Sequence, residues 1–230
     1  MLSLAAAVPA AAGNFSVAPV RIELSKGQPT AVMTVHNNDD APLLVQASAL
    51  AWSQPGGEDL TEPTRELLAT PPIFTLAPNS DQIVRVALRR EPDATRELAY
   101  RLLLAEVPQP ATKDFTGLRV ALRLSLPVFV QPKTGASPDV KWTATRTGTN
   151  ALRVSATNLG TQHLQVTDFE LRFPGSVDTV KASVTRYVLP GSTISWALTT
   201  PSGASAAAGA VVHGFSDSGE FSADIQVTGP

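Results

Sequence analysis

The chain has no cysteine among its 230 residues, which excludes a disulfide framework, thiol chemistry and a cysteine-based zinc site. Histidine is scarce as well. The three histidines, His36, His163 and His213, share no metal-ligand spacing, so each is expected to be an ordinary strand or turn residue. Charged residues make up only 17% and the formal net charge is −2, which argues against a nucleic-acid partner.

Motifs of catalysis are also missing. The sequence has no glycine-rich phosphate loop and no G-x-S-x-G turn for a nucleophilic serine. Asp168 and Glu170 lie two residues apart in a strand-like run, so they are expected to share a solvated strand face and not to form an acid–base pair. We therefore expect a protein that is not an enzyme and that uses no cofactor or metal.

The chain is instead rich in turn formers, with 19 prolines and 15 glycines between short runs of Val, Thr and Leu. No long segment has the 3.6-residue period of a capped helix, so the pattern predicts an all-β protein. Pro19 lies inside the first strand candidate, which predicts an edge strand or one that breaks and switches sheets. The strand candidates are Phe15–Leu24, Ala31–His36, Leu43–Trp52, Gln82–Leu88, Glu97–Pro108, Leu118–Pro132, Val140–Arg146, Ala151–Asn158, Gln165–Phe173, Val180–Val188, Ser192–Leu198, Ala210–His213 and Glu220–Val227.

The strand spacing predicts two tandem immunoglobulin-like sandwiches, at 13–132 and 140–230, joined by the linker 133–139. Before them, residues 1–12 form an apolar run that ends in small residues, which is typical of the back half of a secretory signal peptide. The positively charged opening of such a signal is missing, which suggests that the true start lies upstream. We expect residues 1–12 to be removed on export.

The longest strand candidate is Leu118–Pro132, in which every second residue is apolar from Leu118 to Val130. Such strict alternation predicts a β-strand, here much longer than the usual five or six residues. Pro127 cannot donate to a ladder and so favours an edge strand or a break between two pairings. A long apolar edge invites another strand to pair with it. The alternative is an ordinary sandwich strand whose apolar face is buried in the core.

A succession of motifs in this chain resembles the periplasmic chaperones of pilus assembly, the PapD-like family of the chaperone–usher pathway. The resemblance covers nearly all of the first domain, and the Leu-Pro-Val-Phe-Val spelling at 126–130 is similar to the archaic-type branch. The matching motifs are Ala69-Thr70-Pro71-Pro72, Leu76-x-Pro78, Gln82-Ile83-Val84-Arg85-Val86, Glu97…Tyr100-Arg101, Glu106-Val107-Pro108, Phe129-x-x-Pro132, Asn158-x-Gly160 and Tyr187-Val188-Leu189-Pro190-Gly191.

The resemblance implies two immunoglobulin-like domains in a boomerang arrangement, located in the periplasm. It implies that the long strand is lent to a pilus or fimbrial subunit that lacks a strand, and that the subunit is then delivered to an outer-membrane usher without any nucleotide. By position, the subunit-facing row is expected to be Leu118, Val120, Leu122 and Leu124. The later residues Leu126, Val128 and Val130 are expected to pack into the protein's own core.

The family also grips the subunit's C-terminal carboxylate with a pair of cations, and charge-assisted bonds of this kind fix register. Arg21 matches the arginine of the first strand. The lysine expected on the long strand falls at Pro127, and Gln131 stands where a further basic residue is expected. We hypothesise that Arg101, on the preceding strand, takes the place of the missing lysine.

Two other functions fit a pair of β-sandwiches. The first is an exported adhesive or structural module, which would bury the apolar row that a chaperone must leave available. The second, with weaker support, is a carbohydrate- or metal-binding accessory to an enzyme. For a chaperone, an unpaired apolar edge also predicts self-association of the free protein through the donor strand.

Overall fold

The structure is a computed structural model that describes residues 11–12, 14–108, 119–174, 179–200 and 209–229. By their contacts the residues form two compact units. Unit 1 comprises Met1–Trp52, Thr61–Glu91 and Ala99–Val130, and unit 2 comprises Ser53–Leu60, Pro92–Leu98 and Gln131–Pro230. Within the described part of the chain, the regular elements are strands, except for the short 3-10 turn η1 (Pro55–Gly57). The predicted all-β fold with two sandwich domains is confirmed.

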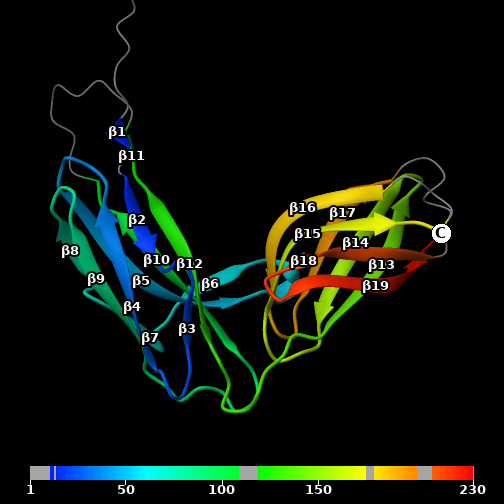
Figure 1. Cartoon of the computed structure of the whole chain (residues 1–230), viewed down its shortest axis with the longest axis horizontal. Helices are drawn as coiled ribbons and strands as arrows, with labels where there is room; N and C mark the ends of the chain where they lie inside the picture. Colours follow the sequence, from blue (N-terminus) through cyan, green and yellow to red (C-terminus); the bar gives the residue numbers. More distant parts are fainter. Residues whose placement is uncertain (1–10, 13, 109–118, 175–178, 201–208, 230) are drawn as a thin grey trace, which may run out of the picture. The chain divides into compact units, whose positions relative to one another are not determined.

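Unit 1 contains two layers of strands (Figure 1). One layer is an antiparallel sheet in the order β2-β4-β9-β7, formed by Phe15–Ala18, Thr30–Asn37, Asp81–Leu88 and Leu67–Thr70. The other has the order β3-β12-β10-β5-β6, with β8 also paired to β5; its strands are Ile22–Leu24, Arg123–Val130, Leu98–Glu106, Leu43–Ser53, Leu60–Pro63 and Ile73–Leu76. A separate two-residue pairing joins β1 (Ala11–Ala12) to β11 (Arg119–Val120) in parallel.

The segment around Pro19 behaves as its sequence predicts. The candidate Phe15–Leu24 breaks after Ala18, and its first half pairs with β4 in one sheet. Its second half, β3, pairs with β12 in the other sheet. Proline cannot donate to a ladder, so the chain changes partners at this point.

The core of unit 1 follows from the two-residue period of its strands. Inward-facing residues of both sheets have little or no exposed surface, whereas their neighbours in sequence face outward. The fully buried residues include Met33, Val35, Val45, Val84, Val86, Leu102, Leu104, Val128 and Val130.

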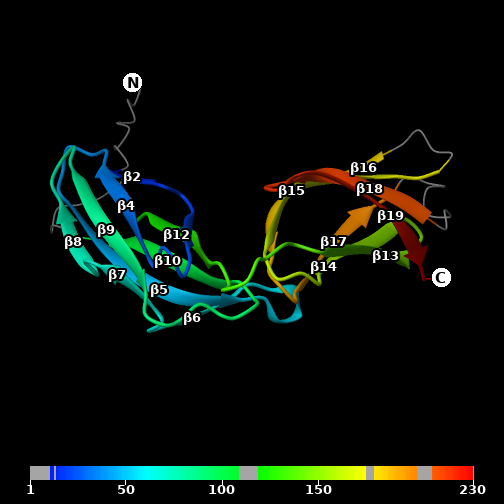
Figure 2. The same cartoon turned by 60° about the horizontal axis from the view of Figure 1, so that its bottom comes forward.

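Unit 2 is a single folded sheet in the order β16-β15-β18-β19-β13-β14-β17. Its strands, in chain order from β13 to β19, are Val140–Gly148, Ala151–Asn158, Leu164–Arg172, Thr179–Val188, Thr193–Thr199, Gly209–Ser216 and Gly219–Thr228. The strand β19 runs antiparallel to β18 and then pairs in parallel with β13 through Val227 and Thr228. This change of partner folds the sheet into two halves around the core (Figure 2).

Aromatic rings occupy the centre of unit 2. Trp142 stacks on Trp196 at 5.7 Å between ring centroids and on Phe221 at 5.2 Å, and Phe169 meets Trp196 edge-on at 5.1 Å. These residues come from four strands in both halves of the sheet, so their packing closes the sandwich.

Two segments that lie between strands of unit 1 in the sequence belong to unit 2. In the segment Ser53–Leu60, the Gln54 amide donates to the Tyr187 carbonyl at 2.9 Å and accepts from the Leu189 N–H at 2.9 Å. The segment Pro92–Leu98 is likewise part of unit 2. The boundaries expected from the sequence, 13–132 and 140–230, assign both segments to the N-terminal domain, because a linear reading follows the chain and not the contacts.

Candidate functional site

The long alternating run is divided in two, so the prediction of one continuous strand is wrong. Its described part forms β11 (Arg119–Val120) and β12 (Arg123–Val130), separated by Ala121 and Leu122. Leu118 lies outside the described residues. The break falls where the Glu106 carboxylate, and not a backbone carbonyl, accepts the Leu122 N–H, at 3.1 Å.

Burial changes steadily along this run. Val120 is 48% exposed, Leu122 and Leu124 are half-buried, and every residue from Leu126 to Val130 is buried. The expectation that Leu126, Val128 and Val130 pack into the protein's own core is therefore confirmed. The earlier apolar residues remain accessible, which is what a strand available to a partner requires.

The edge of β12 is covered over only part of its length. In the sheet order β12 lies between β10 and β3, and β3 reaches only Val128–Val130. Among the strands that the structure describes, none pairs with Arg123–Pro127 on the side away from β10. The accessible part of this stretch, Arg123–Ser125, therefore presents an open strand edge.

The backbone of Leu122 shows which groups face that edge. Its carbonyl accepts from the Glu106 backbone N–H at 2.9 Å, and its own N–H points to the Glu106 side chain, so both polar groups face β10. In a strand, the polar groups of successive residues point to opposite edges. The N–H and carbonyl groups of Ala121, Arg123 and Ser125 therefore face the open edge, whereas Pro127 has no N–H to offer.

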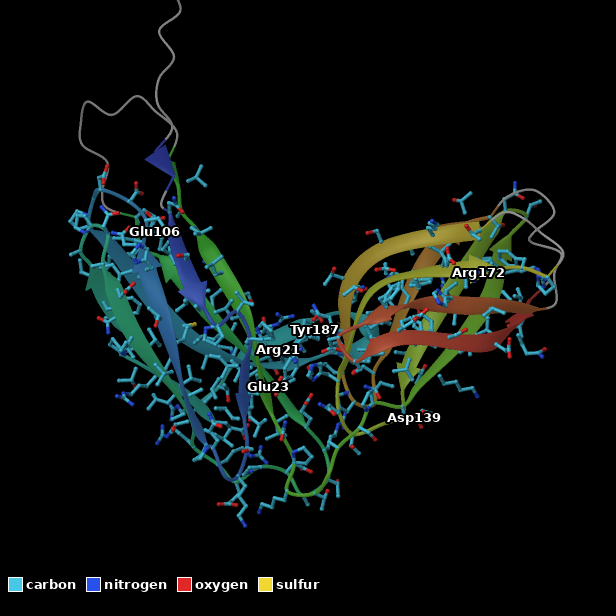
Figure 3. All side chains as sticks on the ribbon, in the orientation of Figure 1. Arg21, Glu23, Glu106, Asp139, Arg172 and Tyr187 are labelled. Carbon is cyan, nitrogen blue, oxygen red and sulfur yellow. The ribbon has the colours of Figure 1, made fainter. Side chains whose placement is uncertain are left out.

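The two predicted anchor cations lie on segments that flank β12. Arg21 immediately precedes β3, and its guanidinium pairs with Glu23 at 2.8 Å (Figure 3). Arg101 is in β10, and its guanidinium lies over the Trp52 ring, 3.6 Å from the ring centroid. Trp52 in turn contacts Phe129 of β12, with 6.0 Å between ring centroids. That both arginines bind a subunit stays a prediction.

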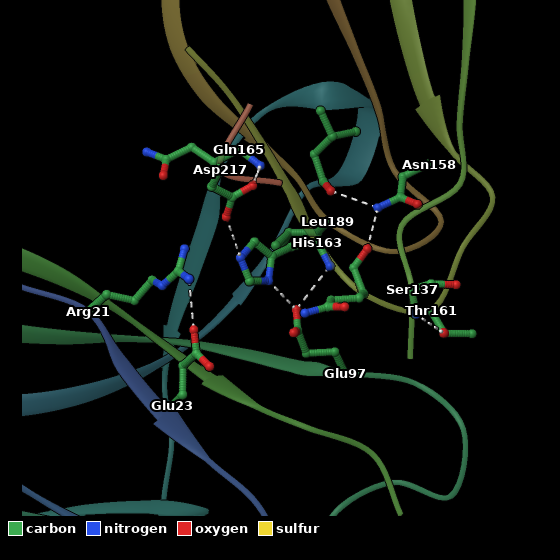
Figure 4. A network of polar contacts seen from close by, with 12 residues as sticks. Arg21, Glu23, Glu97, Ser137, Asn158, Thr161, His163, Gln165, Leu189 and Asp217 are labelled. Carbon is green, nitrogen blue, oxygen red and sulfur yellow. Dashed lines mark hydrogen bonds and ion pairs between the residues drawn. The ribbon is translucent and has the colours of Figure 1, made fainter. Parts of the chain in front are cut away.

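A buried polar cluster in unit 2 was missed by the sequence reasoning (Figure 4). His163 Nδ1 lies 2.6 Å from Glu97 Oε1, and Nε2 lies 3.4 Å from Asp217 Oδ2. The side chains of His163 and Glu97 are 3% and 1% exposed. Glu97 also accepts the His163 backbone N–H at 3.1 Å. Glu97 belongs to a matching motif, but no short spacing links it to residues 163 and 217.

Burial and hydrogen bonding act in opposite directions on His163. Burial disfavours the imidazolium and by itself would lower the pKa of His163. The hydrogen bonds and negative charges of Asp217 and Glu97 outweigh it, so the pKa of His163 is raised above its usual 6.5. The cluster therefore stabilises a charged histidine in unit 2.

The other histidines and the paired carboxylates sit on strand surfaces. His36 Nδ1 is 2.7 Å from Asp81 Oδ1, and His213 Nε2 is 2.6 Å from Glu220 Oε1. Glu170 accepts from Arg172 Nε at 2.6 Å. Among the described residues, no group of three or more His, Cys, Asp or Glu is arranged to hold a metal ion.

Comparison with known proteins agrees with this geometry. The family model described as "Pili and flagellar-assembly chaperone, PapD N-terminal domain" matches residues 14–136, which is over half of the chain. This chain belongs to the PapD chaperone family. The family predicted from the motifs is thereby confirmed.

Individual relatives of this PapD-family chain are distant. It is 28% identical over 139 residues to "Chaperone protein FimB/FhaD" of Bordetella pertussis, and the match covers 56% of this chain and 55% of that protein. The chain thus spans about half the length of the curated relative that it matches.

Solved structures share the fold over almost the whole chain. A chain in the CsuC–CsuE chaperone–tip adhesion subunit pre-assembly complex, from archaic chaperone–usher Csu pili of Acinetobacter baumannii, aligns with a TM-score of 0.70 and 17% identity. It covers 94% of this chain and 100% of that one. The E. coli chaperone DraB aligns with a TM-score of 0.65 and 20% identity, covering 95% and 99%. Within the described residues, no helix is long and apolar enough to cross a membrane.

Proposed function

We propose that this protein is a periplasmic chaperone that holds pilus or fimbrial subunits by lending them the edge at 118–124, and that delivers them to an outer-membrane usher. The open edge of β12 carries this proposal. Accessible apolar residues precede the buried segment Leu126–Val130 in the sequence, and β3 covers β12 only from Val128 onward.

Both the backbone and the side chains of this edge suit strand addition. Outward-facing backbone groups offer a ladder that depends little on the partner's sequence, and alternate side chains give specificity. Full burial of one Val or Leu side chain stabilises by about 1.5–3 kcal/mol. Leu122 and Leu124 are already half-buried, so each contributes less than that, while the 48% exposed Val120 has more surface left to bury.

The same proposal gives Arg21 and Arg101 the task of binding the subunit's C-terminal carboxylate. Both arginines belong to segments that flank β12 in the same sheet. The Arg101 guanidinium lies over the Trp52 ring, 3.6 Å from the ring centroid, and this cation–π contact holds it in place. If Arg21→Ala and Arg101→Ala both capture as much subunit as wild type, this anchor is wrong.

The test is co-expression in the periplasm with the fimbrial-type subunit encoded nearest to this protein, followed by a tagged pull-down. We expect the wild type to recover soluble subunit and the double variant Val120→Asp/Leu122→Asp to recover none. Val32→Asp is a matched control, because Val32 of β4 is also 48% exposed but lies in the other sheet. A folded double variant that recovers as much subunit as Val32→Asp would refute the proposal.

An exported adhesive or structural module is the alternative function. Such a module has no reason to leave a strand edge unpaired beside an exposed apolar residue. The open edge of β12, with the 48% exposed Val120 just before it in the sequence, therefore favours the chaperone. If the pull-down shows no subunit-dependent recovery, while the purified protein binds a surface receptor through either unit, the module becomes the better explanation.

A further inference from the structure

We propose that Glu106 is a positioning residue for the donated strand, fixing the register of the edge by holding Leu122 against β10. This inference rests on the proposed function and adds to it one residue and a defined stretch of backbone. No role for Glu106 follows from its place in the sequence, where it is only part of a matching motif.

Glu106 holds both polar backbone groups of Leu122. Its N–H donates to the Leu122 carbonyl at 2.9 Å, and its side-chain Oε2 accepts from the Leu122 N–H at 3.1 Å. Glu106 is itself held in place, since it is the last residue of β10 and pairs with Val45 of β5. The next residue, Val107, donates its N–H to the Leu44 carbonyl at 2.8 Å.

The use of a side chain at this point allows the strand to change course. In a regular antiparallel ladder, the Leu122 N–H would bond to the backbone carbonyl of Glu106, and the run would continue along β10. The longer carboxylate arm instead accepts this N–H, and β12 separates from β11 at Ala121–Leu122. Glu106 thus ties the alternating run to β10 at Leu122.

Fixing Leu122 also fixes its neighbours. With both polar groups of Leu122 turned to β10, those of Ala121, Arg123 and Ser125 are turned to the open edge. The outward ladder ends at Pro127, which lacks an N–H, and β3 takes over at Val128. An added strand therefore pairs with the stretch from Ala121 to Ser125, in the register that Glu106 sets.

Three substitutions separate the hydrogen bond from charge and from simple packing. Glu106→Gln keeps the length of the arm and an acceptor oxygen, whereas Glu106→Asp keeps the charge but shortens the arm by one methylene. Glu106→Ala removes both the acceptor oxygen and the charge. Glu62→Ala, at an exposed glutamate of β6 in the same sheet, is the control.

Two readouts are measured on the full chain: amide hydrogen exchange at Leu122 in the free protein, and capture of the subunit in the periplasmic pull-down. Both Glu106→Ala and Glu106→Asp remove the acceptor of the Leu122 N–H, so we expect them to bind the subunit up to about tenfold more weakly and to exchange the Leu122 amide faster. Glu106→Gln and Glu62→Ala should match wild type in both readouts.

The outcomes distinguish this inference from the proposed function. If Val120→Asp/Leu122→Asp abolishes capture while Glu106→Ala and Glu106→Asp behave as wild type, the role of Glu106 is refuted and strand donation stands. If Glu106→Gln is as impaired as Glu106→Asp, the hydrogen bond is not what matters, and the inference is again wrong. If Glu106→Ala does not fold, the comparison of Glu106→Gln with Glu106→Asp still tests whether the hydrogen bond to Leu122 is required. Unimpaired capture by the Val120/Leu122 double variant refutes the proposed function itself.

Discussion

Asn37 and Asn158 make closely similar hydrogen bonds in the two units. Each is the last residue of a strand and is fully buried. Asn37 donates its amide to the Ala41 and Ala77 carbonyls at 2.8 and 3.1 Å and accepts from the Asp39 N–H at 3.0 Å.

Asn158 repeats this arrangement, with its two local partners at the same offsets of two and four residues. It donates to the Gln162 and Val188 carbonyls at 2.7 and 2.9 Å and accepts from the Gly160 N–H at 2.9 Å. In both units one amide closes the turn after a strand and ties it to a second segment. Because this amide is buried and fully used, no apolar side chain can replace it without leaving buried carbonyls unpaired.

Asn158→Ala should therefore destabilise the protein by about 2–4 kcal/mol, since several buried backbone groups lose their partner. Urea unfolding monitored by tryptophan fluorescence measures the loss. Asn38→Ala, at an exposed asparagine next to Asn37, is the control and should change the free energy of unfolding little. Equal effects of the two substitutions would contradict the role assigned to the buried amide.

The stability of the protein should fall as the pH rises above neutral because of His163. The folded-state pKa of His163 is raised above 6.5, so its protonated form binds Glu97 and Asp217 with full effect below pH 6.5. This contribution is lost as the pH rises through the higher folded-state pKa. Thermal unfolding across this range should show a decline in wild type that His163→Gln lacks.

His36 provides the control for that pH dependence. It also lies beside a carboxylate, but at an exposed site where solvent screens the pair. His36→Gln should keep the decline seen in wild type. If His163→Gln declines as steeply as wild type, the buried cluster is not the source of the effect.

Tyr100 should contribute to stability through its hydroxyl. The hydroxyl donates to Glu66 Oε2 at 2.7 Å, and Arg90 pairs with the other carboxylate oxygen at 2.8 Å. Burial, followed by the bond to Glu66, strongly raises the pKa of Tyr100, so the phenol stays protonated at all physiological pH. Tyr100→Phe should cost about 1–2 kcal/mol in urea unfolding, and no change would show that the bond has no net value.

The free protein should self-associate through the open edge, since an unpaired apolar strand recruits other strands. Light scattering at increasing concentration should show association in wild type. Leu122→Glu should reduce it, because a charge would be buried at the centre of the new pairing. Association that persists unchanged in this variant would place the contact elsewhere.

The sequence predicts most of the strands of this chain because local patterns determine them. Two-residue alternation and proline or glycine turns place β4, β9 and β14 within one residue of their observed bounds. Pro19 also predicts a change of sheets, because a proline has no N–H to donate to the neighbouring strand at that position. Local chemistry is sufficient in each of these cases.

The break at Leu122 and the cluster around His163 could not be predicted in the same way. Glu106 and Leu122 are 16 residues apart, and Glu97 and His163 are 66 apart. Nothing in the alternation of Leu118–Val130 indicates that a carboxylate will take one of its backbone N–H groups. Such contacts depend on which strands become neighbours, and this information appears only once the fold is known.

The packing of Ser53–Leu60 and Pro92–Leu98 with unit 2 has a practical consequence for dissecting the protein. A fragment that starts near residue 131 would contain every strand of the second sandwich but would lack Gln54 and Glu97. The Leu189 N–H and the His163 ring would then each lose a buried partner. Cleaving the chain at the sequence linker would therefore release a weakened second sandwich, and the protein is best studied as an undivided chain.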